Sequence, residues 1–317
     1  MYITVDQPGT LVKEAREILT ELGTLYVPQG QSTEELSTHF ARADAVLSWG
    51  NTLIGEELLA HASSRLKVIS IIGVGYDNVD VAAASRQNIQ LVNLPGVNAR
   101  AVAEYTLGAV LALTRGLLKG DHHSKGQEWV LASHFTGPQL NELVCGVIGL
   151  GHIGREVVRI MSALGVRMLG YDPVVDDELL LGLAVERVDL DTLLRLSGVV
   201  TLHVPLVEGT YQMLGSRELG LMPSGSYLVN SARANVVDED ALLLALESGH
   251  LAGAAIDVYP VEPPDLSRPL YALPQVLVTP HVAAMTHRAV GDMQVGAAEN
   301  IAAVLRGNKP TNVVNEG

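Results

Sequence analysis

Short apolar runs alternate with amphipathic segments along most of the 317-residue chain. A run that is apolar throughout predicts a buried strand, whereas apolar residues that recur every three or four positions predict a helix. Strands that alternate with helices are typical of a parallel sheet covered by helices on both faces. In the first hundred residues, strands are predicted at Tyr2–Val5, Thr24–Val27, Ala45–Ser48, Val68–Ile72 and Leu91–Val92, and helices at Thr10–Leu22, Thr33–Ala41, Gly55–Ala62 and Val79–Ser85.

The same alternation resumes after one long predicted helix, Ala99–Leu118, and a more polar, irregular segment, 119–143. Within that helix, Glu104 lies among apolar residues and is expected to face a partner or a cleft. The chain is long enough for two domains, so the predicted fold class is α/β with two doubly wound parallel sheets. The later strands are predicted at Val144–Ile148, Val166–Leu169, Leu183–Val185, Val199–His203, Tyr227–Asn230, Ala254–Asp257 and Val276–Thr279, and the later helices at Asp189–Arg195, Arg217–Leu221, Asp238–Ser248 and His287–Leu305.

Residues 144–172 carry the most specific motif of the chain. An apolar run is followed by Gly149, Gly151 and Gly154 in the spacing G-x-G-x-x-G and then by a helical pattern. The first glycine permits a tight turn, the second lets the backbone approach a pyrophosphate, and the third lets helix and strand pack closely. The helix N-terminus offers free N–H groups to the phosphates. A second apolar run ends at Asp172, which would bind a ribose diol and repel a 2′-phosphate, so the motif predicts NAD rather than NADP.

Charge and cysteine content limit the possible partners and compartments. The sequence has 35 acidic and 21 basic residues, a formal net charge of −14, whereas sequence-independent nucleic-acid binding needs a basic surface. The single cysteine, Cys145, allows no disulfide within the chain and fits a reducing cytoplasm. Residues 1–6 lack the basic start of a signal peptide, and the longest apolar stretch, Leu107–Leu113, is too short for a membrane span. We therefore expect a cytoplasmic protein that binds neither nucleic acid nor membrane.

Three ionisable residues, Arg233, Glu262 and His281, each follow one of the last three predicted strands. Ligands bind at the carboxyl ends of the strands in such sheets, so these side chains are candidate catalytic groups. Arginine can bind a carboxylate in bidentate fashion, histidine can exchange a proton near neutral pH, and a nearby glutamate favours the protonated histidine. Taken singly, each has a plainer interpretation: a surface ion pair, a solvated loop acid and a helix cap, respectively. No metal site is predicted, because no metal-ligand spacing surrounds His122, His123, His134 or His287.

Eight motifs occur along the chain in an order and spacing shared with one enzyme family. They are IIGVGYDNVD (71–80), VNARAVAEYTLG (97–108), VCGVIGLGHIG (144–154), GYDP (170–173), HVP (203–205), NSARANVVDEDAL (230–242), GAAIDVYPVEPP (253–264) and TPHVAA (279–284). On these motifs the chain resembles the D-isomer-specific 2-hydroxyacid dehydrogenase family over nearly its whole length. The resemblance implies a Rossmann NAD-binding domain, residues 98–284, inserted into a flavodoxin-like substrate domain formed by residues 1–97 and 285–317. It also implies a homodimer through the NAD-binding domain, built on the long helix and the segment around Trp129.

The resemblance further implies roles for individual residues. His281 would donate the proton to the keto oxygen as hydride arrives from the nicotinamide, and Glu262 would favour its charged form. Arg233 and the backbone amides of Val74 and Gly75 would bind the substrate carboxylate. The implied cofactor residues lie at the glycine turn or at the ends of neighbouring strands; they are Gly149, Gly151, His152, Ile153, Gly154, Asp172, His203, Pro205, Thr210, Ala232 and Asp257.

The substrate class is the least determined part of the interpretation. The strand end Ser48–Asn51 and the loop at residues 71–78 contain no Lys or Arg, which disfavours a phosphorylated substrate. We therefore expect a small 2-keto acid such as hydroxypyruvate or glyoxylate, and Trp49 could cover its side group. Two alternatives stay open: phosphoglycerate dehydrogenase-type activity, and an NAD(H)-sensing co-repressor or scaffold with little turnover, since such relatives can retain the three catalytic residues.

Overall fold

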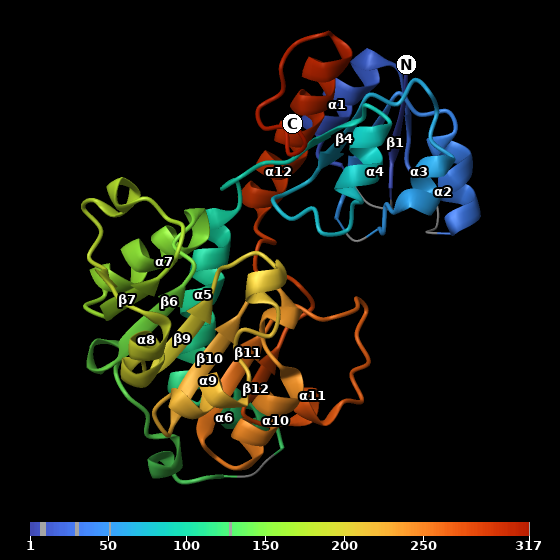
Figure 1. The fold of residues 1–317 in the computed structure, drawn as a ribbon. Coiled ribbons are helices and arrows are strands. Elements are labelled where there is room, and N and C mark those ends of the chain that lie inside the picture. The colour runs from blue at the N-terminus through green and yellow to red at the C-terminus, as the bar shows by residue number, and fades with distance from the viewer. Residues whose placement is uncertain (7–10, 29–31, 51, 127–128, 317) are drawn as a thin grey trace. The chain divides into compact units, whose positions relative to one another are not determined.

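The computed structural model describes residues 1–6, 11–28, 32–50, 52–126 and 129–316. The chain divides into two compact units, each with its own parallel sheet (Figure 1). We call Met1–Asn98 with Met285–Gly317 the first unit and Ala99–Ala284 the second unit. The predicted fold class, α/β with two doubly wound parallel sheets, is confirmed.

The described residues of the first unit form a five-stranded parallel sheet in the order β2-β1-β3-β4-β5. This order is that of flavodoxin-like sheets, in which the direction of winding reverses between β1 and β3. The strands are β1 (Tyr2–Val5), β2 (Thr24–Tyr26), β3 (Ala45–Ser48), β4 (Val68–Ile71) and β5 (Gln90–Val92), and the helices are α1 (Lys13–Leu22), α2 (Thr33–Phe40), α3 (Glu56–Ala60), α4 (Val81–Arg86) and α12 (His287–Leu305). Part of the predicted first helix, Thr10, lies outside the described residues.

Alternate residues of the central strands bury the two faces of this sheet. Ile69 and Ile71 of β4 pack with Phe40 of α2 in one apolar cluster, to which α3 and α4 also contribute. Between them, the buried Ser70 points to the other face, where its hydroxyl donates to the carbonyl oxygen of Ala297 in α12 at 3.0 Å. Helices α12 and α1 pack together on that face. The last helix of the chain is therefore part of the core of the first unit.

The described residues of the second unit form a seven-stranded parallel sheet in the order β12-β11-β10-β9-β6-β7-β8. This is the Rossmann order, extended by one strand, and it reverses between β6 and β9. The strands are β6 (Val144–Ile148), β7 (Arg167–Tyr171), β8 (Glu186–Arg187), β9 (Val199–Leu202), β10 (Ser226–Asn230), β11 (Leu251–Ile256) and β12 (Val276–Val278). The α-helices are α5 (Ala99–Thr114), α6 (Leu117–Lys125), α7 (His152–Ala163), α8 (Leu190–Leu196), α9 (Ser216–Leu221), α10 (Glu239–Glu247) and α11 (Pro269–Ala272).

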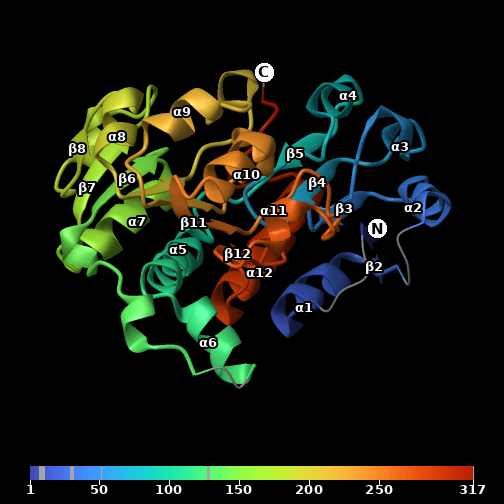
Figure 2. The ribbon, with the colours of Figure 1, turned by 90° about the horizontal axis from the view of Figure 1, so that it is seen from below.

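Two apolar clusters cover the faces of the second sheet. On one face, α5 lies alongside α7 in both views, and Val110 and Val157 pack with Val147 of β6 (Figures 1 and 2). On the other face, α8, α9 and α10 pack over β9 and β10, with Leu242 and Val200 among the buried residues. Because both faces are covered, only the strand ends and the loops that follow them can present polar groups to a ligand.

The helix predicted at Ala99–Leu118 is in fact two helices. Gly116 has φ +60°, a left-handed conformation that stops α5 at Thr114, and α6 begins at the next residue with a bend of 63°. The segment predicted to be irregular, 119–143, accordingly starts with the rest of α6 and also holds two short 3₁₀ turns. Within the described residues no single helix combines the length and apolarity of a membrane span, although the bent α5–α6 pair passes on length and composition.

One further segment differs from expectation for an identifiable reason. The strand predicted at Leu183–Val185 begins later in the structure. Leu183 and Val185 instead pack their side chains against the apolar cluster that contains Val110, Val157 and Val147. The residues that pair with β7 are the next two, Glu186 and Arg187. Glu104, expected to face a partner or a cleft, is exposed and forms an ion pair with Arg100 one turn earlier, at 2.6 Å.

Candidate functional site

The glycine turn between β6 and α7 has the geometry that a pyrophosphate requires. Gly149 has φ +93°, and a Cβ there would lie 2.5 Å from the carbonyl oxygen of His203 at the end of β9. A Cβ on Gly154 would lie 1.9 Å from the carbonyl oxygen of Gly149, so only glycine allows this close packing. Apart from its neighbours in sequence, no described residue comes within 4 Å of the Cβ position of Gly151, the N-cap of α7, so there is open space at the start of this helix.

His152 and Ile153 are the first two residues of α7, directly after that open space. The N-cap residue Gly151 provides no side-chain hydrogen bond to this helix terminus. The turn also lies between β6 and β9, where the winding of the sheet reverses and where nucleotides bind in Rossmann folds. The turn thus fits a dinucleotide phosphate on backbone groups alone.

Asp172 follows β7 and is tied to the glycine turn. Its carboxylate accepts hydrogen bonds from the backbone N–H groups of Leu150 at 2.8 Å, Val174 at 2.9 Å and Val175 at 3.0 Å. A carboxylate accepts up to about four hydrogen bonds, so one position remains for a ribose hydroxyl. Arg187 of β8 donates to the carbonyl oxygen of Asp172 at 2.7 Å and further fixes this loop.

The loop after β9 holds three of the predicted cofactor residues. His203 Nε2 lies 3.0 Å from Thr201 Oγ1, while Nδ1 is covered and has no partner among the described residues. Burial lowers the pKa of His203 to about 3, so its ring is neutral. The hydroxyl of Thr210 donates to the carbonyl oxygen of Pro205 at 2.6 Å and accepts from the amide of Val207 at 2.9 Å. Thr210 therefore braces the exposed Pro205 rather than presenting a free hydroxyl.

The turn after β10 positions Ala232 and Arg233. Asn230 accepts from the amide of Ala232 at 3.1 Å and donates to the carbonyl oxygen of Arg233 at 2.9 Å. Arg233 Nη1 donates to the carbonyl oxygen of Ala232 at 2.7 Å, and a carbonyl oxygen can accept a second hydrogen bond. Sequence reasoning missed Asn230, although it ends the strand and its short amide side chain is typical of residues that brace turns.

The structure brings Glu262 and His281 into direct contact. His281 Nδ1 lies 2.9 Å and 3.0 Å from the two carboxylate oxygens of Glu262, and the side chains are 46% and 27% exposed. Because a carboxylate only accepts, Nδ1 carries the shared proton and Nε2 is left to face a ligand.

The charge of Glu262 follows from its surroundings. Burial by itself raises the pKa of the Glu262 carboxyl, but the hydrogen bond and charge of His281 outweigh it and hold the pKa below its usual value. The amide of Tyr259 and the charge of Arg233 act in the same direction. Glu262 is therefore a carboxylate at neutral pH, and Arg233 is near enough to contribute to its electrostatic environment.

Asp257 directly follows β11 and is completely buried. Its carboxylate accepts from the hydroxyl of Thr279 at 2.6 Å and from the amides of Val282 and Ala283, each at 2.8 Å. These contacts direct it toward the loop that contains His281. The family resemblance implied only that Asp257 is a cofactor residue, and the sequence gave no sign of these contacts with the loop.

The two residues predicted to bind the substrate carboxylate, Val74 and Gly75, lie in the first unit, after β4. Gly73 has φ +135°, and the carbonyl oxygen of Val74 accepts from Asn93 at 2.7 Å. The amide N–H groups of Val74 and Gly75 donate to no acceptor in the described part of this unit. Such adjacent, unused amides are suited to an anion.

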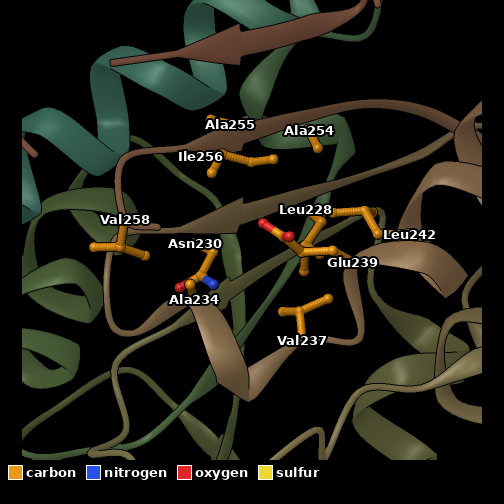
Figure 3. Close-up of a pocket in the computed structure, with 10 residues that line it drawn as sticks. All are labelled: Leu228, Asn230, Ala234, Val237, Glu239, Leu242, Ala254, Ala255, Ile256 and Val258. Carbon is orange, nitrogen blue, oxygen red and sulfur yellow. The ribbon is translucent and has the colours of Figure 1, made fainter. Parts of the chain in front are cut away.

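A cavity in the second unit borders the loops after β10 and β11, because Asn230, Ala234 and Val258 are among its lining residues (Figure 3). It is lined mainly by aliphatic side chains of β10, β11 and the start of α10. The carboxylate of Glu239, which lies among them in the close-up, already accepts from Tyr271 at 2.6 Å and from Arg268. We interpret the cavity as a packing gap in the core. Among the described residues no group of His, Cys, Asp and Glu side chains could hold a metal ion.

Comparison with known proteins agrees with this geometry. Residues 107–283 match the model of the D-isomer specific 2-hydroxyacid dehydrogenase, NAD binding domain. The chain is 37% identical over 316 residues to a D-3-phosphoglycerate dehydrogenase of Archaeoglobus fulgidus, covering 99% of this chain but only 59% of that relative. It is 36% identical over 324 residues to a glyoxylate reductase of Thermofilum pendens, covering 100% and 94%. The solved structure of TT0316 protein from Thermus thermophilus superposes with a TM-score of 0.90 at 33% identity, covering 99% and 100%.

Proposed function

We propose, because this chain belongs to the D-isomer specific 2-hydroxyacid dehydrogenase family, that it interconverts a small 2-keto acid and the corresponding D-2-hydroxy acid with NAD(H). The main support for the proposal is the contact between His281 Nδ1 and a carboxylate oxygen of Glu262 at 2.9 Å, in the electrostatic neighbourhood of Arg233 in the second unit. An acid–base histidine held by a carboxylate, next to a carboxylate-binding arginine, is the set of groups that reduction of a keto acid needs.

Each residue then has a defined task. His281 holds a proton on Nδ1 against Glu262 and presents Nε2 to the substrate oxygen, to which it donates in reduction and from which it accepts in oxidation. Arg233 binds the substrate carboxylate and polarises the adjacent carbonyl. The amides of Val74 and Gly75 are a second carboxylate site in the first unit. NAD(H), when bound, supplies or accepts the hydride.

The cofactor residues support NAD over NADP. The open space at Gly151 and the uncapped start of α7 would hold the pyrophosphate, and Asp172 would accept from a ribose hydroxyl. A carboxylate at that point disfavours a 2′-phosphate by charge repulsion. The neutral His203 would add no charge to the cofactor cleft.

We favour a small, unphosphorylated substrate such as hydroxypyruvate or glyoxylate. A glyoxylate reductase of Thermofilum pendens is 36% identical to this chain over 324 residues. The candidate substrate loop after β4 also carries no cationic side chain. Within the stretch Ser48–Asn51, Asn51 lies outside the described residues, and Trp49 is half-buried at the end of β3.

The test is loss of NADH absorbance with glyoxylate, hydroxypyruvate, pyruvate, phenylpyruvate and 3-phosphohydroxypyruvate, repeated with NADPH. We expect the fastest oxidation with NADH and one of the small keto acids. Preference for 3-phosphohydroxypyruvate would instead favour phosphoglycerate dehydrogenase-type activity. Tight NADH binding without oxidation across the panel would favour the sensor or scaffold alternative and contradict the proposal.

We also propose a cytoplasmic homodimer formed through the second unit. The buried Cys145, the single cysteine of the sequence, suits a reducing compartment. In the segment that follows α6, Trp129 is 95% exposed and Leu131 is 65% exposed, so two large apolar side chains lie close together in sequence on the surface. A second copy of the chain would cover them in a two-fold interface. Light scattering should give a dimer for the natural chain and a larger monomer fraction for Trp129→Asp; an unchanged dimer would place the interface elsewhere.

A further inference from the structure

The loop that carries His281 has a backbone conformation that needs an explanation. His281 has φ +54°, in the left-handed region that residues other than glycine seldom adopt. Such a conformation persists only where surrounding contacts determine it. The hydrogen bonds on either side of His281 are therefore part of what holds its imidazole in place.

Asp257 fixes the loop on both sides of the histidine. After it, the amides of Val282 and Ala283 donate to the two carboxylate oxygens of Asp257 at 2.8 Å each. Before it, the hydroxyl of Thr279 donates to the same carboxylate at 2.6 Å. The amide of His281 itself donates to the carbonyl oxygen of Thr279 at 2.9 Å. One buried carboxylate thus determines the path of the chain through the left-handed residue.

Tyr105 of α5 extends this network from the opposite side. Its hydroxyl lies 2.7 Å from Thr279 Oγ1. The direction of that hydrogen bond follows from the number of protons available. The Asp257 carboxylate only accepts, so Thr279 donates its single hydroxyl proton to Asp257. The hydrogen bond between Tyr105 and Thr279 must therefore be donated by Tyr105. Burial raises the pKa of Tyr105 to about 12, so the phenol keeps its proton over the neutral range.

We propose that Tyr105 is a positioning residue for His281, acting through Thr279 and Asp257. Tyr105 donates to Thr279, Thr279 donates to Asp257, and Asp257 holds the two amides that follow the histidine. The proposal rests on the proposed function, because the position of the imidazole matters for turnover only if His281 exchanges the substrate proton. Small displacements of an acid–base group lower the rate of proton transfer while leaving cofactor contacts intact.

The first test is Tyr105→Phe, which removes the hydroxyl and keeps the ring. We expect kcat with the best keto acid to fall about tenfold, with a change of less than about twofold in the Kd for NADH. Tyr227→Phe is the matched control. Tyr227 on β10 is also half-buried in the second unit, and its hydroxyl has no hydrogen bond to any residue that the structure describes, so its kcat should stay within about twofold.

A second pair of variants tests the same path without altering α5. Thr279→Ser keeps the bridging hydroxyl, whereas Thr279→Val keeps the shape of the side chain and removes the hydroxyl. We expect Thr279→Val to lose about tenfold or more in kcat and Thr279→Ser to stay within about threefold. Equal losses in the two variants would mean that packing rather than hydrogen bonding is responsible, and the proposal would be wrong.

Amide hydrogen exchange in the cofactor-free protein gives a readout that does not depend on turnover. The peptide that contains Val282 and Ala283 should exchange about tenfold faster in Tyr105→Phe and at the natural rate in Tyr227→Phe. Unchanged exchange in Tyr105→Phe overturns the positioning role. A third outcome separates the two proposals. If Tyr105→Phe exchanges faster but the natural chain oxidises NADH with none of the keto acids, the hydrogen-bond network is supported and the proposed function is contradicted.

Discussion

The two units of this chain have the same architecture and present opposite kinds of chemistry. Both are parallel sheets that reverse their winding once, and both carry their candidate ligand groups on loops at the carboxyl ends of strands. In the first unit, the loop after β4 offers the bare backbone amides of Val74 and Gly75. In the second unit, the loops after β10, β11 and β12 offer an arginine, a glutamate and a histidine, with the glutamate and histidine bound to each other. The sheet topology determines where a ligand-binding group lies, and the residue types of the loops determine its chemistry.

The comparison leads to a ranking of substitutions. Changes to the ionisable side chains of the second unit should act on the rate of the chemical step or on the cofactor. Changes in the first unit should act on affinity or stability and leave the chemistry in place. The variants below test that division.

His281→Ala should have the largest effect. Loss of the proton donor should lower kcat by roughly 10²–10⁴-fold, the usual contribution of a general acid. The Kd for NADH should stay nearly unchanged, because the proposed cofactor contacts are made elsewhere in the unit. Steady-state kinetics and fluorescence titration measure the two quantities, and His61→Ala, an exposed histidine of the first unit, is the control. A kcat equal to that of the natural chain would rule out the proton-donor role.

Asp172→Ala should come next. The variant loses an acceptor for the ribose and leaves three backbone amides without their partner, so NADH should bind about 10- to 100-fold more weakly. The preference for NADH over NADPH should narrow because the negative charge is gone. Titration with both cofactors measures this preference. If the ratio of the two Kd values does not move, Asp172 does not recognise the ribose.

Asp6→Asn tests the first unit, with the smallest effect. Asp6 directly follows β1 and accepts from the hydroxyl of Ser48 and the amide of Trp49. Burial raises the pKa of Asp6 to about 6, above that of the unfolded chain, even though these hydrogen bonds lower it. The folded state therefore binds the proton more tightly, and the free energy of unfolding should fall as pH rises from about 4 to 6.

Chemical denaturation across that pH range measures the effect. Relative to Asp6→Asn, the natural chain should lose on the order of 1–3 kcal/mol more of its free energy of unfolding between the two ends. Asp292→Asn, at an exposed ion pair of α12, controls for the change in charge. An identical slope in Asp6→Asn would mean that the Asp6 carboxyl does not titrate in this range.

The features that could be predicted from sequence are those written in local patterns. The spacing of Gly149, Gly151 and Gly154 between two apolar runs is enough to locate a nucleotide turn, because each glycine answers a separate steric demand. Short, mostly apolar runs such as Ala45–Ser48 are buried strands in the structure, because such runs can be covered on both faces of a parallel sheet. The apolar run Leu183–Val185 shows where such prediction fails. Apolar residues are found both in strands and in loops that pack against the core, so the run alone does not distinguish the two.

The contacts that sequence reasoning missed join residues far apart in the chain. Tyr105 and Thr279 are separated by 174 positions in the chain. The residues next to each of them do not indicate that its hydroxyl belongs to a hydrogen-bond network rather than to the apolar core. The break at Gly116 was missed because the apolar pattern continues on both sides, and only the left-handed backbone of that glycine ends the helix. The pairing of Glu262 with His281 was anticipated, because both follow neighbouring strands.

The position of α12 has a consequence for the order in which the chain is made. This last helix covers one face of the first sheet, where Gln294 accepts from the amide of Val12 at 2.6 Å and Ala297 accepts from Ser70. The second unit, by contrast, is continuous from residue 99 to 284. During synthesis the strands of the first unit are made first, but their core stays incomplete until the end. The helix that completes this core is translated after the whole of the second unit. A nascent chain that has left the ribosome only as far as residue 284 would hold a finished nucleotide-binding fold attached to an open sheet, and that open sheet is the part that chaperones would need to protect.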